Sequence, residues 1–170
     1  GTTFEANSSL SSGGADVSSA VIVNSTFTGN QAQGRAGALE TGNGGTVIVH
    51  STFSGNRSDF VGGILGPIEP AGLHLVNSVV AGNEGRVPDV RADGGLTTRG
   101  ANLFGSAPEG GPLDQSPDDI VIDGEKQSAL ETVFAEVARN PSTGTVGGVL
   151  ADNGGVVPTV ALADGATNPA

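Results

Sequence analysis

The sequence predicts an all-β protein, a right-handed parallel β-helix with one short α-helix near the C-terminal end. Three observations indicate this fold. A motif of the type Phe-x-x-Asn returns at offsets of 23, 26 and 27 residues, a β-branched run precedes each later copy, and Gly and Asn separate the runs. Short strands with this period are typical of a solenoid whose coils stack in parallel. A chain of 170 residues usually forms one domain, which we divide into β-helix coils over 1–105 and a loop, helix and closing segment over 106–170.

The repeated motif and the runs before it predict the interior of the coils. The copies of the motif begin at Phe4, Phe27, Phe53 and Val80, and the runs before the last three span 21–26, 47–52 and 73–79. Equivalent positions in successive coils lie about 4.8 Å apart, one above another. We therefore expect two internal stacks. Their members are Ile22, Ile48 and Leu75 in one stack, and Phe27, Phe53 and Val80 in the other.

Asparagine recurs beside these stacks, although it is disfavoured inside strands. At a corner between two strands, an Asn accepts left-handed backbone geometry and bonds its side-chain amide to the neighbouring coil. Two ladders are expected, Asn30 with Asn56 and Asn83, and Asn24 with His50 and Asn77. We interpret His50 as a ladder member rather than a ligand or base, because its ring has the donor and acceptor capacity of an amide. His74 is expected at an outward strand position on the surface.

Three parts of the chain resemble known bacterial families. The blocks 24–30 and 51–56, with the Gly-Gly-Ile-Leu partner at 62–65, look like the repeats of polymorphic outer-membrane proteins and related right-handed β-helix surface proteins. The Gly-Ala-Asn-Leu-Phe-Gly element at 100–105 resembles one of the choice-of-anchor Q domain, and 150–162 resembles the closing segment of that domain. Residues 165–170 match the beginning of its usual ending.

This resemblance implies a pectin-lyase-like superhelix in a secreted or surface-attached bacterial protein, located outside the cell or at the cell surface or outer membrane. It implies no catalytic residue. The chain begins at Gly1 in the middle of a coil and stops at Ala170 within the closing motif. We therefore interpret it as a piece of a longer chain, so the missing leader carries no information on location.

The C-terminal third departs from the repeat. Residues 84–124 are rich in Pro and Asp and predict loops with short strands at 103–104 and 120–122. Apolar residues within 125–139 lie at helical spacing, with Asp123 as the N-cap and Asn140-Pro141 as the end. We expect the apolar face of this helix to close the open end of the solenoid, and a partner-binding helix is the alternative.

Composition excludes several classes of function. The chain has 18 acidic and 7 basic residues, a net charge of −11, and no Cys, Met, Trp or Tyr, so disulfides, thiolate metal sites and catalysis by Cys or Tyr are excluded. The arginines are scattered and Lys126 is the only lysine, so we expect no nucleic-acid partner. No apolar run approaches the roughly 20 residues that span a bilayer, and we expect no transmembrane segment.

Carboxylates are the remaining candidates for chemistry. Asp114, Asp118 and Asp119 lie on one Pro-containing loop, where oxygen ligands for calcium are one interpretation and a solvated acidic loop is the favoured one. Among the coils, carboxylates occur mostly in turns, and we identify no pair held across a groove, as glycoside hydrolysis requires. The residues considered are Glu5, Asp16, Glu40, Asp59 and Glu69.

Arg35 and Arg57 flank the coils, but the sequence identifies no charged neighbour for either at matching coil height. We assign no catalytic, cofactor-binding or metal-ligating residue and no cofactor, and we do not expect an enzyme. The expected function is a non-catalytic scaffold or adhesion module that presents loops 31–46, 57–72 and 84–100 to a glycan or a cell-surface protein. The alternatives are a polysaccharide-active enzyme whose catalytic coils lie outside this chain, and a structural subunit that associates end to end through residues 1–10.

Overall fold

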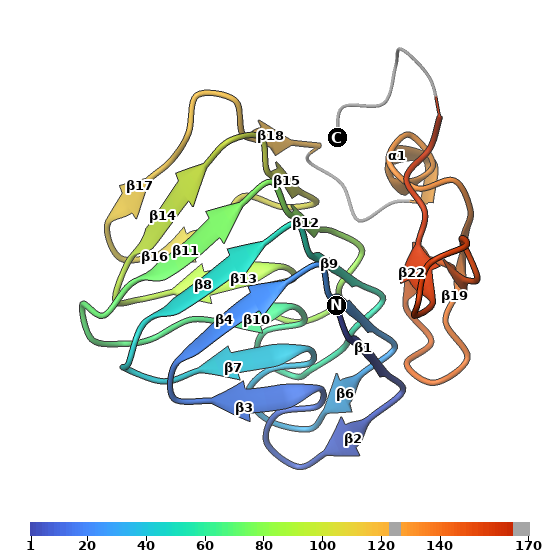
Figure 1. The fold of residues 1–170 in the computed structure, drawn as a ribbon. Helices are drawn as coiled ribbons and strands as arrows, with labels where there is room; N and C mark the ends of the chain where they lie inside the picture. Colours follow the sequence, from blue (N-terminus) through green and yellow to red (C-terminus); the bar gives the residue numbers. More distant parts are fainter. Residues whose placement is uncertain (123–126, 165–170) are drawn as a thin grey trace.

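The computed structural model of the chain describes residues 1–122 and 127–164, and it shows the parallel β-helix that the sequence predicts (Figure 1). Three parallel sheets run along the axis of the coils. The first sheet has the order β1 (Thr3–Glu5), β5 (Thr26–Thr28), β9 (Thr52–Ser54), β12 (Val79–Val80), β15 (Leu103–Phe104) and β18 (Ile120–Val121).

The other two sheets have five strands each. The second sheet consists of β3 (Ala15–Val17), β7 (Leu39–Thr41), β10 (Ile64–Leu65), β13 (Val90–Ala92) and β16 (Glu109–Gly110). The third sheet consists of β4 (Ala20–Val23), β8 (Thr46–Val49), β11 (Leu73–Val76), β14 (Leu96–Arg99) and β17 (Leu113–Asp114). A short pair, β2 (Ser8–Ser9) with β6 (Gln31–Ala32), lies between the first and second sheets along the chain.

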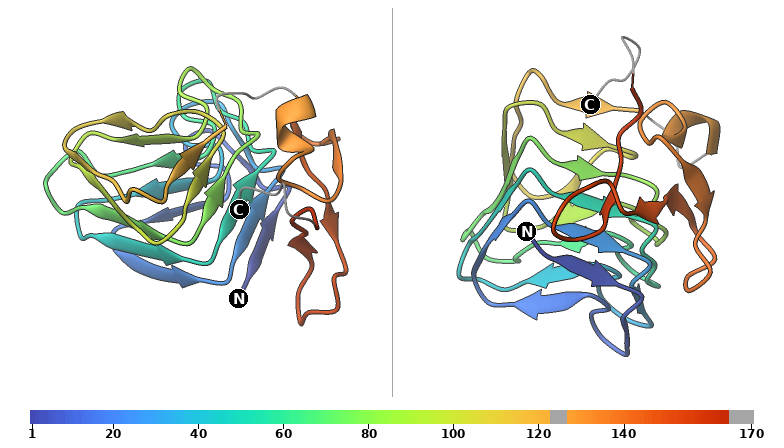
Figure 2. Two further views of the ribbon diagram at one scale, coloured as in Figure 1. Left: turned by 90° about the horizontal axis from the view of Figure 1, so that it is seen from above. Right: turned by 45° about the vertical axis from the view of Figure 1, so that its right-hand side comes forward.

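The chain passes through the first, second and third sheets in turn and then returns to the first sheet one coil higher. Seen from above, it turns anticlockwise as it rises towards the viewer, so the β-helix is right-handed (Figure 2). The parallel pairing continues through β16, β17 and β18, and therefore extends past residue 105 to Val121. The short strands expected near 103–104 and 120–122 are confirmed as β15 and β18.

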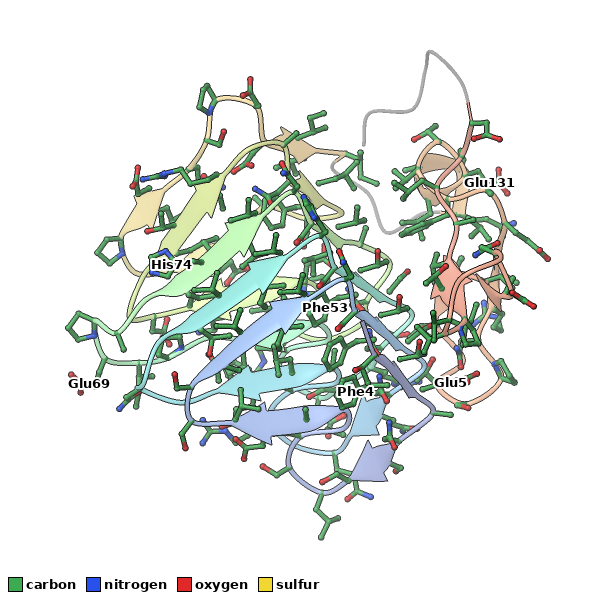
Figure 3. All side chains as sticks on the ribbon, in the orientation of Figure 1. Phe4, Glu5, Phe53, Glu69, His74 and Glu131 are labelled. Carbon is green, nitrogen blue, oxygen red and sulfur yellow. The ribbon has the colours of Figure 1, made fainter. Side chains whose placement is uncertain are left out.

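Both predicted internal stacks are confirmed by the strand register. Phe27 pairs with Phe53 and Phe53 pairs with Val80 in the first sheet. The stack in the third sheet consists of Ile22, Ile48 and Leu75. The rings of Phe27 and Phe53 are stacked with centroids 4.6 Å apart, and Phe4 extends the stack with a centroid distance of 4.4 Å (Figure 3). These rings and aliphatic side chains form the main core inside the coils.

The first asparagine ladder is also confirmed. The side-chain amide of Asn30 donates to Oδ1 of Asn56 at 2.9 Å, and that of Asn56 donates to Oδ1 of Asn83 at 2.9 Å. All three side chains are buried. The left-handed backbone geometry, however, belongs to the glycine before each Asn and not to the Asn itself. The three glycines are Gly29, Gly55 and Gly82, with φ of 65°, 71° and 75°.

The second ladder is confirmed only in part. Asn24, His50 and Asn77 do occupy equivalent left-handed corner positions, with φ of 51°, 48° and 47°. The Nδ2 atom of Asn77 lies 3.2 Å from Nε2 of His50, so His50 takes part in the ladder. Within the described residues, no side-chain hydrogen bond joins Asn24 to His50. His74 faces outward from β11, as expected.

A serine ladder that the sequence reading missed runs next to this corner. The backbone N–H of Ser25 donates to Oγ of Ser51 at 3.1 Å, and that of Ser51 donates to Oγ of Ser78 at 3.2 Å. The ladder continues through Asn102 and ends on the carboxylate of Asp119. Polar groups at the bends are thus satisfied from one coil to the next, as burial requires.

The C-terminal arm, residues 127–164, corrects one prediction about secondary structure. It contains α1 (Gln127–Leu130), β19 (Val137–Arg139), β20 (Val146–Gly148), β21 (Leu150–Ala151) and β22 (Thr159–Val160). The expectation of a helix that extends to residue 139 is wrong, because β19 pairs antiparallel with β20. A short helix is marginal on its own, and the hairpin satisfies the same backbone groups. The expected N-cap, Asp123, lies outside the described residues, as do 125–126 and 165–170.

The position of the arm corrects a second prediction. The helix does not close the open end of the solenoid; the arm lies along the outer face of the first sheet (Figures 1 and 2). Leu130, Val133 and Phe134 pack there against Val79 and Leu103. The outward positions of β12 and β15 are apolar, so the arm removes them from water, and this burial favours the side of the coils over the end.

Candidate binding groove

A hollow of about 490 Å³ lies on the outer side of the second sheet. Its lining comes entirely from the three segments expected to present a binding surface, 31–46, 57–72 and 84–100. The lining residues are Arg35, Glu40, Thr41, Gly42, Asn43, Phe60, Leu65, Gly66, Ile68 and Asp93. We call this hollow, together with the outward side chains of the second sheet that adjoin it, the groove.

The outward side chains of the second sheet form one column along the groove. The register places Asp16, Glu40, Leu65, Arg91 and Glu109 at successive levels of this column. Asp16 and Glu40 are direct partners on β3 and β7. Adjacent strands are about 4.8 Å apart, so two carboxylates do project side by side from neighbouring coils. The sequence analysis identified no carboxylates at matching positions of neighbouring coils, and the register of Asp16 and Glu40 corrects this.

Glu40 is the least exposed charged side chain of the groove. Its Oε1 atom lies 2.6 Å from Nε of Arg35, and its Oε2 atom accepts a hydrogen bond from Oγ of Ser12 at 2.5 Å. The Glu40 side chain is only 12% exposed. Both carboxylate oxygens are therefore engaged, and a partly buried ion pair with an extra hydrogen bond holds its geometry better than a surface pair does.

A second ion pair, Arg91 with Asp93, lies two levels above Glu40 in the column. Arg91 contacts Asp93 through two nitrogens, with Nε–Oδ2 at 3.1 Å and Nη2–Oδ1 at 3.0 Å, which is a bidentate arrangement. Glu109 lies one coil above, with its carboxylate 3.9 Å from Nη1 of Arg91. Two-point contact fixes the plane of the guanidinium as well as its position.

The sequence reading found no charged neighbours for Arg35 and Arg57, and the structure corrects this. Arg35 contacts Glu40, and Arg57 lies 3.8 Å from Glu84 one coil above. Arg57 also donates to the backbone oxygen of Thr143 at 3.2 Å, so it links the coils to the arm. Both neighbours were missed because the repeat was aligned on its apolar positions only.

The apolar part of the groove centres on Phe60. This ring packs against a small cluster outside the main core, formed by Ala36, Val61, Leu65 and Val87. The guanidinium carbons of Arg86 and Arg91 lie over the ring, 6.0 and 5.4 Å from its centroid. Cation–π contacts of this kind hold the ring and the arginines in place with about 0.5–1 kcal/mol each at exposed sites.

The acidic loop does not gather its carboxylates. Asp114 contacts Nη2 of Arg99 at 2.7 Å, and Asp119 accepts hydrogen bonds from the backbone and side-chain nitrogens of Asn102 at 3.1 and 2.8 Å. Asp118 is exposed. Within 1–122 and 127–164, no group of three or more His, Cys, Asp or Glu side chains is arranged to hold a metal ion.

The pairing of Asp16 with Glu40 was missed, although the sequence carries a signal for it. Gly13-Gly14-Ala15-Asp16 precedes Gly37-Ala38-Leu39-Glu40 by 24 residues, an offset within the range of the repeat. Aligning these two blocks places the two carboxylates at one level of the column. No repeated offset in the sequence relates Arg35, Phe60 and Asp93, which also line the groove, because these residues lie in turns of unequal length.

The fold and the groove define a right-handed parallel β-helix protein with a charged and partly aromatic groove along one sheet. Comparison with protein-family models, with curated proteins and with solved structures gave no match. Among the described residues, no helix has the length and apolar character needed to cross a bilayer.

Proposed function

We propose that the chain is a non-catalytic binding scaffold of a secreted or cell-surface bacterial protein, and that the groove is its binding surface. One observation carries this proposal: three segments far apart in the sequence converge on one hollow, where Arg35, Glu40, Phe60 and Asp93 combine charged hydrogen-bonding groups with an aromatic ring. Concave sites that place a few polar groups around an apolar surface are typical of ligand binding.

The rest of the molecule supports the role of a scaffold. Stacked rings and amide ladders run through successive coils, so the loops that form the groove rest on a regular interior. A net charge of −11 keeps such a surface soluble. The resemblance of the repeats to bacterial surface proteins supports an extracellular setting.

Binding and turnover can be measured on the same samples. The purified chain is applied to an array of neutral and acidic glycans and to bacterial and host cell-surface proteins, and the Phe60→Ala variant is tested beside it. We expect binding by the unmodified chain and loss of binding by the variant. Parallel incubations with neutral and acidic polysaccharides follow reducing ends and unsaturated products. Turnover by this chain would contradict the non-catalytic proposal.

A polysaccharide-active enzyme is the second candidate, and the pairing of Asp16 with Glu40 favours it. Retaining glycosidases hold two carboxyl groups about 5–5.5 Å apart, close to the spacing of adjacent strands. The Arg35 and Ser12 contacts keep Glu40 engaged, which favours a binding role instead. If the incubations show product, Asp16→Asn and Glu40→Gln should each abolish it, whereas Asp118→Asn on the exposed acidic loop should not.

A structural subunit is the third candidate, and the open end below the first coil favours it. A hollow of about 370 Å³ at this end is lined by apolar residues of the coil interior, among them Phe4, Val17 and Ile22. A second copy of the chain stacked there would cover Phe4 and the free strand edges. Sedimentation at increasing concentration should then show association that Phe4→Ser removes and Ile68→Ser, at an exposed site away from this end of the coils, leaves intact. A strictly monomeric chain would exclude this candidate.

A further inference from the structure

We infer that the groove takes a neutral carbohydrate and discriminates against polyanionic glycans. This inference rests on the proposed function, because it assumes that the groove is the binding surface. Three features of the groove support it. The arginines are already paired with carboxylates, the paired groups keep donors and acceptors that can bind hydroxyls, and apolar side chains lie between the pairs.

The first step concerns the cations that an anionic glycan requires. Arg35 is engaged by Glu40 at 2.6 Å, and Arg91 is engaged by Asp93 through two contacts near 3 Å. Arg86, which stands beside the groove, lies over the Phe60 ring. An incoming carboxylate is therefore repelled by the carboxylates already held beside Arg35 and Arg91, and the net charge of −11 opposes its approach. A neutral ligand meets neither cost.

The second step concerns hydroxyl groups. A guanidinium paired with a carboxylate still directs spare N–H donors outward, and the carboxylate still has spare lone pairs. The Arg35–Glu40 and Arg91–Asp93 pairs thus present donors and acceptors at fixed spacing, as vicinal sugar hydroxyls require. A ligand rich in hydroxyl groups suits such a lining.

The third step concerns the apolar face of a sugar ring. Phe60, Leu65 and Ile68 line the hollow between the two ion pairs. The C–H face of a pyranose packs on surfaces of this kind while its hydroxyls point to the rim. The volume of about 490 Å³ lies within the range of about 300–1,000 Å³ that small-molecule sites occupy.

Calorimetric titration of the whole chain tests this inference with four probes: cellotetraose, xylotetraose and mannotetraose as neutral oligosaccharides, and tetragalacturonate as the anionic one. We expect at least one neutral probe to bind, with an affinity that does not change between low and high salt, and tetragalacturonate to bind at least about tenfold more weakly. Phe60→Ala should abolish neutral binding. Val21→Ala, which removes an exposed side chain from the third sheet, should not.

A charge variant sharpens the test. Glu40→Gln combined with Asp93→Asn removes the carboxylate partner of Arg35 and the two-point partner of Arg91, which keeps Glu109 at 3.9 Å. Tetragalacturonate should then bind about tenfold or more tightly than to the unmodified chain, in a salt-dependent manner. Circular dichroism checks that the variant is folded. If it does not fold, the salt dependence of each probe on the unmodified chain decides the same question.

The outcomes separate the inference from the proposed function. Preference of the unmodified chain for tetragalacturonate, lost in Phe60→Ala, overturns the inference and leaves the binding scaffold in place. Binding of a neutral probe that Phe60→Ala does not weaken also overturns the inference, since the site then lies elsewhere. No binding to any probe overturns the inference, and if the array of glycans and cell-surface proteins is also blank, the proposed function fails with it.

Discussion

The side-chain amide of Asn83 donates a hydrogen bond to Oδ1 of Asp89 at 2.9 Å, and this contact ends the asparagine ladder. Each Asn of the ladder donates to the Oδ1 atom of the next, so the last amide needs a partner that accepts only. An ionised carboxylate is such a partner. The ladder through Asn102 ends in the same way, on Asp119. Both ladders therefore end on a carboxylate.

We expect Asp89→Ala to lower the free energy of unfolding by about 1–3 kcal/mol, because it leaves the amide of Asn83 and the N–H of Ser106 without their buried acceptor. Urea denaturation followed by circular dichroism measures this change. Asp118→Ala, on an exposed loop, is the control and should change the value by no more than about 0.5 kcal/mol. If the two substitutions lower the free energy of unfolding equally, Asp89 does not end the ladder as we describe.

Position along the ladder should also determine the effect of losing an Asn. Asn56 is buried and bonded to Asn30, Asn83 and the backbone of Phe27, whereas Asn7 is exposed at the first coil. Asn56→Ala should therefore destabilise the chain by about 1–3 kcal/mol more than Asn7→Ala, since it leaves buried polar groups of two neighbouring coils without hydrogen-bond partners. The comparison uses the midpoints and slopes of denaturant unfolding. A larger loss for Asn7→Ala would show that the ladder does not act as described.

The ring stack should be the most sensitive part of the core. Phe53→Ala removes a fully buried ring from between Phe27 and Val80, and we expect a loss of about 3–5 kcal/mol. Val21→Ala, at a position 74% exposed on the outer face of the third sheet, should cost little. Thermal and urea unfolding measure both. If Phe53→Ala costs no more than Val21→Ala, the stack is not the core.

Gly37, the first residue of the Gly-Ala-Leu block, lies where a larger side chain would not fit. A Cβ atom at Gly37 would collide with the backbone oxygen of Gly62 and lie 2.7 Å from the nitrogen of Arg57. Gly37→Ala should therefore push neighbouring coils apart and cost about 1–3 kcal/mol. Gly155→Ala, where the nearest atom is 3.4 Å away, is the control. Equal stability of both variants in urea would show that the coils are not packed this closely.

Hydrogen bonds from the arm to the coils should help to hold the arm in place. The hydroxyls of Thr143 and Thr145 both donate to the backbone oxygen of Gly55, at 2.9 and 2.8 Å. Thr145→Val should loosen the arm and speed its cleavage in limited proteolysis, with the β-helix itself still protected. Thr132→Val removes a hydroxyl that bonds only within the arm, to Ala129, and should leave cleavage unchanged. Unaltered cleavage of Thr145→Val would mean that apolar packing alone holds the arm.

The sequence by itself determined the coils, the interior stacks and the first asparagine ladder. Parallel coils place equivalent residues one above another, so a regular offset along the chain directly specifies spatial neighbours such as Phe27 and Phe53. The same logic specified Asp16 beside Glu40, but this pair was visible only to an alignment that includes the polar positions of the repeat.

The tertiary structure alone decided the arm and the wall of the groove. Val137 and Arg139 lie in a strand because a hairpin partner and the apolar face of β12 and β15 outweigh local helical spacing. Arg35 and Glu40 meet across a bend at residues 37–38, a contact that no repeated pattern specifies. Contacts of this kind join segments with no common period, so their energies depend on packing in three dimensions and not on the pattern of residues along the chain.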